Sequence, residues 1–167
     1  ISHHNVWFPA DYGAEFRDIF SGRPATDPTI YACVPNDSLM RPDDDHESWF
    51  LLINAPRHGT ARNDFDWSDA AFVQSYADRA IEQLAGRGVD LRSRVLWREI
   101  ITPADLERRT RAPGGSIYGT SSNGMRAAFL RPANASPIPG LYLVGGSAHP
   151  GGGLPLVGMS AEIVADM

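Results

Sequence analysis

The chain has 167 residues, of which 43% are hydrophobic and 21% are charged, and its net charge is −5. This composition is typical of a globular protein with one core and at most a small second unit. The arginines are scattered over an acidic chain, which argues against a nucleic-acid surface or a polybasic membrane patch, and no apolar run is long enough to span a bilayer. The single cysteine, Cys33, excludes an internal disulfide, and its place in the run IYACVP favours a buried thiol in a reducing compartment.

The first third of the chain predicts a small sheet. Strands are expected at residues 3–8, 30–34 and 48–54, with a short helix at 14–20 that stops near Gly22 and Pro24. Connections this short favour an antiparallel or mixed sheet with one apolar face.

A run of charged residues lies between the second and third predicted strands. Its members are Asp43, Asp44, Asp45, His46 and Glu47. Carboxylates so close together are compatible with a calcium or other metal loop, but acidic runs next to proline are more often solvated turns, which is the interpretation we favour. None of the histidines forms a helical i, i+4 pair around an acidic residue, so no zinc site is predicted.

The middle of the chain predicts a long amphipathic helix. Ser68 is the expected N-cap, the helix runs to about Ala85, and Gly86 and Gly88 end it. Apolar residues recur at helical spacing, which is typical of a face buried in a core. These residues are Phe72, Val73, Tyr76, Ala77, Ala80, Ile81 and Leu84.

A strand is predicted next, at residues 95–101, followed by a short helix that Thr102 caps and Pro103 opens, ending near Thr110. The neighbouring charges Arg98 and Glu99 are either active-site groups or a surface ion pair, and the ion pair is favoured.

From Ala112 the composition changes to Gly, Ser, Asn and Pro. We expect an anchored loop here, because the apolar residues within it need a place to be buried. They are Ile117, Tyr118, Met125 and Phe129, and polar Ser121, Ser122 and Asn123 lie among them. No G-x-S-x-G elbow or Ser-His-Asp order occurs, which argues against a hydrolase.

The last segment predicts a strand, a glycine turn and a helix in direct succession. Residues 141–144 are an unbroken apolar run, typical of a parallel strand buried on both faces. Gly145 and Gly146 end the strand, and after a second glycine cluster at 151–153, Pro155 lies in the first turn of a helix that runs to Met167. The amide end of such a helix attracts a phosphate or an electron-rich ligand edge.

Glycine turns of this kind also occur as plain strand-to-helix connections without a ligand, so the turn alone leaves both alternatives open. The turn lacks G-x-x-x-x-G-K-[ST], which argues against a phosphate-binding loop of nucleotide triphosphatases. It also lacks G-x-G-x-x-G, so it is not the first βαβ unit of a dinucleotide fold.

Three stretches, GGSIYG at 114–119, AFLRPAN at 128–134 and GLYLVGGSAHPGGGLPLVGMSAEIVA at 140–165, together resemble the C-terminal end of the phytoene desaturase family of FAD-dependent carotenoid desaturases. Upstream, HHNVWF, AEFRDIF, IYACVP and SWFLLINAP follow in the family's order. The resemblance implies an α+β / α/β fold class, as the C-terminal fragment of a two-domain FAD/NAD(P)-binding flavoprotein. Residues 1–111 then belong to the substrate domain, with a mixed sheet and helices, and residues 112–167 return to the FAD domain as a strand and helix.

FAD is the cofactor that the resemblance implies, and no catalytic residue is assigned. The residues expected to contact FAD are Gly145, Gly146, Ser147, Gly153, Leu154, Pro155, Leu156 and Val157. Arg131 lies near the flavin by resemblance, or is a surface arginine that supports the turn at 132–139. His149 is assigned a positional role rather than proton transfer. The hypothesis requires the end of the chain to form a strand that turns through glycines into a helix.

The implied function is desaturation of a long apolar isoprenoid such as phytoene or a related carotenoid. Both ends of the sequence look cut, so we expect a fragment whose N-terminal FAD-binding part is missing, with activity only in the full-length protein. A cytoplasmic protein with peripheral contact at the inner membrane is expected, and nucleic acid is not a partner.

Three alternatives stay open. One is a non-catalytic lipid-binding or interaction domain, and a second is a carotenoid isomerase or oxygenase. The third is a flavin amine oxidase, which the pair Gly146 and Ser147 disfavours because many such oxidases have an acidic residue after the strand-ending glycine.

Overall fold

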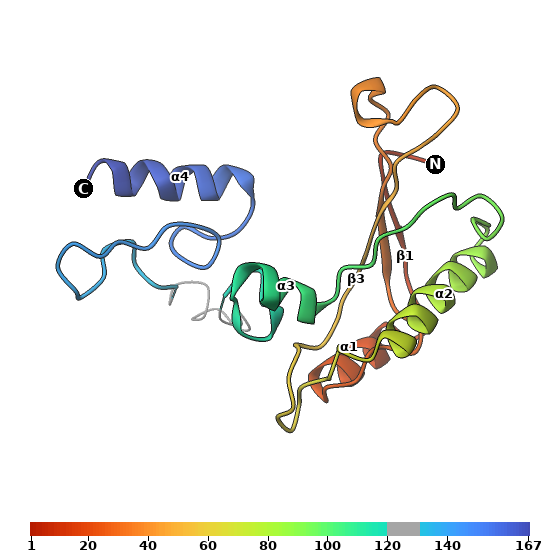
Figure 1. Cartoon of the computed structure of the whole chain (residues 1–167), viewed down its shortest axis with the longest axis horizontal. Helices are drawn as coiled ribbons and strands as arrows, with labels where there is room; N and C mark the ends of the chain where they lie inside the picture. The colour runs from red at the N-terminus through yellow and green to blue at the C-terminus, as the bar shows by residue number, and fades with distance from the viewer. Residues whose placement is uncertain (120–130) are drawn as a thin grey trace. The chain divides into compact units, whose positions relative to one another are not determined.

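The computed structural model describes residues 1–119 and 131–167, which form two compact units, Ile1–Ala104 and Asp105–Met167 (Figure 1). Helices and a small antiparallel sheet make the chain a mixed α+β structure. No helix in the described ranges is both long enough and apolar enough to cross a bilayer. The elements are β1 (His4–Trp7), α1 (Tyr12–Phe20), β2 (Ile30–Cys33), β3 (Phe50–Ile53), α2 (Ala70–Gly86), α3 (Pro103–Thr110) and α4 (Leu154–Ala165).

The first unit is built on a three-stranded antiparallel sheet in the order β1-β2-β3. His4 lies opposite Cys33 in the register between β1 and β2, and Cys33 lies opposite Phe50 in the register between β2 and β3. The three predicted strands and the short helix between the first two are therefore confirmed, and the sheet is antiparallel.

One face of the sheet packs against α2. Ile30 of β2 and Ala80 and Leu84 of α2 are the buried centre of this core, with Trp7 and Leu51 among the residues packed around them. The apolar face predicted from helical spacing is confirmed, because all of its members are buried or half-buried. The burial of this face stabilises the unit through the hydrophobic effect.

The predicted N-cap of α2 is wrong by one residue. The carboxylate of Asp69 accepts hydrogen bonds from the N–H groups of Ala71 and Phe72, whereas the Ser68 hydroxyl is bonded to Asp66. Asp69 lies directly before the first turn and its carboxylate can accept from two free amides at once, so it takes the cap position. The helix ends at Gly86, as predicted.

The opposite face of the sheet is open within the described residues. Val6, Phe50 and Leu52 point to it and keep 47%, 57% and 45% of their surface exposed. Cys33 also lies on this face and is half-buried, so the prediction of a buried core thiol is wrong. Side chains alternate along a strand, and in β2 the inward positions belong to Ile30 and Ala32.

A buried carboxylate joins α1 to the sheet. Glu15 is 1% exposed, and its carboxylate accepts hydrogen bonds from the backbone N–H and hydroxyl of Thr29 and from the side-chain amide of Asn54. Thr29 precedes β2 and Asn54 follows β3, so this one side chain connects three elements.

The strand predicted at 95–101 is not formed. The segment is extended but has no ladder partner among the described strands, and Leu96 and Trp97 are 79% and 78% exposed. A strand exists only when a neighbour takes its backbone hydrogen bonds, which a sequence pattern cannot show. The short helix that follows begins at Pro103 and ends at Thr110, as predicted.

Tyr76 on α2 gives a testable pH dependence. Burial raises the pKa of its hydroxyl to about 12, and the hydroxyl donates a hydrogen bond to the Ala25 carbonyl oxygen at 3.1 Å. In the unfolded chain a tyrosine titrates near a pKa of about 10. Because the folded pKa is the higher one, the stabilisation is complete below about pH 10 and is lost as the pH rises through about 12. Urea unfolding at a series of alkaline pH values, compared with Tyr76→Phe, measures this loss, and equal slopes for the two proteins would contradict it.

Candidate functional site

The start of α4 presents free backbone amides. Gly153 is the N-cap with φ 100°, no side chain caps the helix, and Pro155 in the first turn has no N–H. The amides of Leu154 and Leu156 are therefore the donors of the first turn, and Leu154 is 89% exposed. This end carries the positive pole of the helix dipole, which attracts an anion or an electron-rich group.

Two glycine segments meet just before this helix. A Cβ atom on Gly146 would lie 3.4 Å from the Cα of Gly152, so the two backbones pack directly against each other. Gly145 and Gly153 have φ values of 119° and 100°, which favour glycine, and no described atom lies within 4 Å of a Cβ built on either. The backbone at these two glycines is thus open to an approaching ligand.

The buried side chain of Asn134 stabilises the glycine turn. It is 3% exposed, and its side-chain nitrogen lies 2.9 Å from the carbonyl oxygens of both Leu143 and His149 and 3.0 Å from the Ser160 hydroxyl oxygen. Because an amide nitrogen has two hydrogens, these three acceptors share them. Ser160 is fully buried and also accepts a hydrogen bond from the Gly145 N–H at 3.2 Å. Asn134 and Ser160 together connect residues 141–144, the glycine turn and α4.

Neither Asn134 nor Ser160 was predicted as a site residue. A signal for Ser160 exists in the sequence, because it is a hydroxyl within the apolar helix LPLVGMSAEIVA. Asn134 lies in the stretch AFLRPAN, but its amide contacts depend on backbone carbonyls that only folding brings near.

Arg131 connects two loops, the one that contains Tyr118 and the glycine turn, through hydrogen bonds. Its guanidinium donates to the carbonyl oxygens of Tyr118 at 3.2 Å and Gly146 at 2.8 Å. The Tyr118 ring in turn lies over Gly152, where a Cβ would overlap it. Arg131 therefore supports the glycine turn rather than only the 132–139 turn, and its position near a flavin stays a prediction.

The loop before Arg131 is less buried than expected. Ile117 and Tyr118 are 58% and 53% exposed, so the prediction that they are buried is wrong for these two. The second unit offers them no covering element among the described residues. Met125 and Phe129, together with Ser121, Ser122 and Asn123, lie outside the described residues.

His149 and Ser147 lie in the turn between the two glycine segments. The His149 N–H donates to the Pro132 carbonyl oxygen at 2.9 Å, its carbonyl oxygen accepts from Asn134, and its side chain is exposed. These backbone contacts suit a positional residue. Ser147 is exposed and faces Gly119, where a Cβ would lie 2.9 Å from that of Ser147.

The buried strand predicted at 141–144 is wrong. Only an isolated antiparallel bridge between Ala135 and Tyr142 forms here, and the four residues of the run are 37% to 53% exposed. The segment is extended, but among the described residues it has one bridging neighbour, whereas a parallel strand needs a ladder. The glycine turn and the helix follow as predicted, and the helix ends at Ala165 instead of Met167. The strand, turn and helix that the flavin hypothesis requires are therefore met in the turn and the helix but not in the strand.

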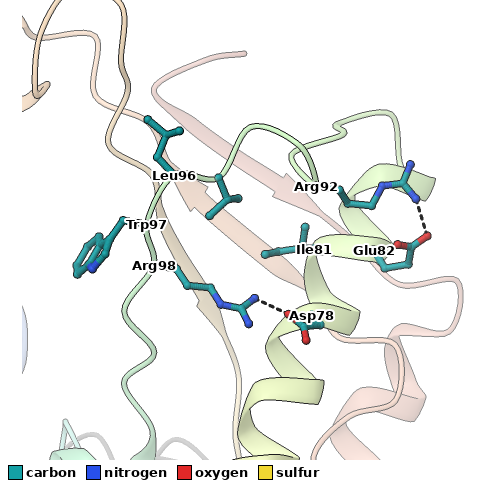
Figure 2. A pocket seen from close by; sticks show the side chains of 8 residues that line it. Asp78, Ile81, Glu82, Arg92, Leu96, Trp97 and Arg98 are labelled. Carbon is teal, nitrogen blue, oxygen red and sulfur yellow. Dashed lines mark hydrogen bonds and ion pairs between the residues drawn. The ribbon is translucent and has the colours of Figure 1, made fainter.

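A hollow of about 420 Å³ lies in the first unit, between α2 and the segment 92–98 (Figure 2). Arg92 pairs with Glu82 at 2.9 Å, and Arg98 pairs with Asp78 at 2.6 Å. Arg98 is thus ion-paired, but with Asp78 of α2, whereas the sequence predicted a pair of Arg98 with its neighbour Glu99. All four charged residues of this hollow are paired with one another, and it contains none of the predicted cofactor residues.

The acidic run at 43–47 forms an exposed turn. The Asp43 carboxylate bonds to the His46 ring at 2.6 Å, and this bond is the main cause that lowers the pKa of Asp43. A different group of side chains brings possible metal ligands together: ligand atoms of His3, His4 and Cys33 all lie within 4.8 Å of one another. Sequence spacing missed this group, because strand pairing assembles it.

Comparison with known proteins identifies the class. No family model matches the chain. It is 36% identical over 99% of its length to a hydroxyneurosporene desaturase of Rubrivivax gelatinosus, and 35% identical over 98% to a 1-hydroxycarotenoid 3,4-desaturase of Flavobacterium sp. (strain P99-3). It is 34% identical over 98% of its length to a 4,4'-diapophytoene desaturase (4,4'-diaponeurosporene-forming) of Staphylococcus aureus.

The chain therefore belongs to the carotenoid desaturase family. It spans about a third of the length of these curated relatives, between 31% and 33%. The glycine turn and α4 described above are part of this shared third.

Proposed function

We propose that this sequence is part of an FAD-dependent oxidoreductase that desaturates a long apolar isoprenoid, such as phytoene or a related carotenoid. The observation that carries the proposal is similarity over nearly the whole chain to three proteins whose names all state a carotenoid desaturation. Activity is expected only in a full-length protein, because the chain covers about a third of such relatives.

The chain is proposed to contribute to two domains of a flavoprotein. Residues 1–111 belong to the substrate domain, and residues 112–167 return to the FAD domain, whose G-x-G-x-x-G part lies elsewhere in the full-length protein. The exposed apolar surface of the second unit supports this division: Leu154, Leu156 and Met159 of α4 are 89%, 37% and 49% exposed. Leu156 and Met159 are three residues apart and share one side of the helix, and exposed apolar side chains of this kind are typical of an interface.

The glycine turn fits the role of half a flavin site. Gly145, Gly146 and Ser147 would offer backbone to the ribityl and pyrophosphate groups, and the amides of Leu154 and Leu156 would face the electron-rich side of the ring. The support is the open backbone at Gly145 and Gly153 and the uncapped start of α4. FAD supplies the electron acceptor that removal of hydrogen from a hydrocarbon requires, since no side chain does so. The chain's own residues would hold and orient the flavin. They would also place the positive end of α4 beside the part of the ring where negative charge collects on reduction.

The open face of the sheet is proposed to form one wall for the apolar substrate. Val6, Phe50 and Leu52 are about half exposed there, and they present hydrocarbon without a charge. A polyene bound against such a face gains the hydrophobic energy that a polar surface would not give.

The test uses the full-length protein that contains this sequence. Purified with FAD, it should show flavin absorbance, and with phytoene and an electron acceptor it should yield products that have each lost pairs of hydrogen atoms, measured by mass spectrometry. Unchanged mass with altered retention would instead support an isomerase, added oxygen an oxygenase, and peroxide release with polyamines an amine oxidase. A colourless protein that shows no flavin absorbance after reconstitution would contradict the enzyme and favour the lipid-binding alternative.

The 167-residue chain by itself should bind FAD far more weakly than the full-length protein, because the proposed ADP-binding half is elsewhere. Titration calorimetry of both proteins with FAD measures the difference. Tight stoichiometric binding by this chain would contradict the division of the site between two segments.

A further inference from the structure

The open face of the sheet carries a group of metal-ligand side chains at the end of β1 and β2. His4 and Cys33 lie directly opposite each other in the register, and the Val34 N–H donates to the His3 carbonyl oxygen at 2.8 Å, which holds His3 beside the end of β2. Ligand atoms of the three side chains lie within 4.8 Å of one another. Backbone pairing thus brings Cys33 to two adjacent histidines that are 29 and 30 residues away in sequence.

The ligand atoms of His3, His4 and Cys33 are close enough to bind one cation after small side-chain movements. In a tetrahedral zinc site with two nitrogen ligands and one sulfur ligand, the ligand atoms are about 3.5 Å apart. Approach from 4.8 Å needs side-chain adjustments of about 1 Å, and both imidazoles are exposed and able to turn, while the backbone at both strands stays paired. The cation therefore requires no change of fold.

A neighbouring hydroxyl orients one of the ligands. Nδ1 of His4 lies 2.8 Å from the Tyr31 hydroxyl, and Tyr31 is on the same face of β2 as Cys33. When a metal takes Nε2 of His4, Nδ1 keeps its hydrogen and donates it to the Tyr31 oxygen. A hydrogen bond of this kind to the far nitrogen is the usual support of a metal-bound histidine.

We propose that His3, His4 and Cys33 form a site for a divalent cation of the zinc class, bound by two imidazole nitrogens and one thiolate. Nitrogen and thiolate donors select zinc and similar borderline metals over calcium or magnesium. Solvent takes the fourth position of the tetrahedron. Binding breaks the Cys33 S–H bond, forms the sulfur–metal bond and releases one proton, so affinity falls as the pH is lowered. The site involves no electron transfer, so it is independent of the proposed flavin chemistry. It lies at one end of the same sheet face as the proposed substrate wall, where Phe50 is opposite Cys33.

Cobalt is the probe for the test, because a thiolate ligand gives Co²⁺ an intense charge-transfer band that histidines alone do not. Titration of this chain with Co²⁺ should produce that band together with the visible bands of a four-coordinate ion, and Zn²⁺ should remove both. Cys33→Ser should abolish the band, and His3→Gln or His4→Gln, which each remove a ligand, should weaken Zn²⁺ binding by more than the roughly tenfold to hundredfold that loss of an outer-shell partner costs. Tyr31→Phe keeps all three ligands and should weaken it by about tenfold.

A second measurement uses the fact that Cys33 is the chain's single cysteine. Zn²⁺ should slow its reaction with a thiol reagent, and His3→Gln should remove that protection. His46→Gln is the matched control, an exposed histidine at another turn, and should behave as wild type. Zn²⁺ binding of equal affinity in wild type and Cys33→Ser, or a Co²⁺ complex without a thiolate band, would mean adventitious binding to surface histidines and would overturn the proposal.

Discussion

Glu15→Ala is expected to lower the free energy of unfolding of the first unit by about 3 kcal/mol. The carboxylate is 1% exposed and accepts three hydrogen bonds, two from Thr29 and one from Asn54. Alanine leaves these donors without their acceptor in a place that water reaches poorly, and a hydrogen bond to a charged group contributes about 1.5–3 kcal/mol. Rearrangement of the side chains around the site recovers part of this loss, so the expected value of about 3 kcal/mol is well below the sum of three such hydrogen bonds. Urea unfolding followed by circular dichroism measures the change.

Two variants separate this role from general effects on α1. Glu15→Gln keeps the length of the side chain but replaces one acceptor oxygen with a donor, so about half of the loss is expected. Asp11→Ala removes an exposed acid from the same helix, the N-cap, and should cost only about 1 kcal/mol. If Glu15→Ala costs no more than Asp11→Ala, the carboxylate does not hold α1 to the sheet.

Asn134→Ala is expected to loosen the glycine turn. The substitution removes the amide contacts to Leu143, His149 and Ser160, while the backbone bond from Leu143 N–H to the residue 134 carbonyl can persist. Two lost hydrogen bonds of about 1 kcal/mol each correspond to about thirtyfold more frequent opening of the turn. Hydrogen exchange of the Gly145 and His149 amides measures this in the present chain. In the full-length protein, FAD affinity should fall by a similar factor if the proposed function is correct.

The controls for Asn134 distinguish hydrogen bonding from packing. Asn134→Asp has nearly the same shape but no amide hydrogens, so it should loosen the turn as much as alanine does. Ser136→Ala removes a hydroxyl that, among the described residues, hydrogen-bonds only to the backbone of Ile138, and exchange at the turn should stay as in wild type. Wild-type exchange in Asn134→Asp would show that the amide donors do not stabilise the turn, whatever the outcome for FAD.

The local elements of this protein follow from its residue pattern. The three strands of the sheet, α1 and the apolar stripe of α2 lie where alternation and helical spacing predict them, because these periodicities reflect which side chains must be buried. The glycines and Pro155 likewise predict the turn and the start of α4 through their backbone preferences. The family resemblance rests on the same stretches.

Which strands pair and which side chains come into contact is decided by the tertiary structure. Residues 95–101 and 141–144 have the composition of strands, yet neither has a ladder partner among the described residues, and a backbone hydrogen bond needs both of its ends. The contacts of Asn134 with Ser160 and of Cys33 with His4 join positions that are far apart in sequence. Sequence spacing predicts periodic faces, because these are local, whereas a hydrogen-bond network or a set of metal ligands depends on which segments meet in three dimensions.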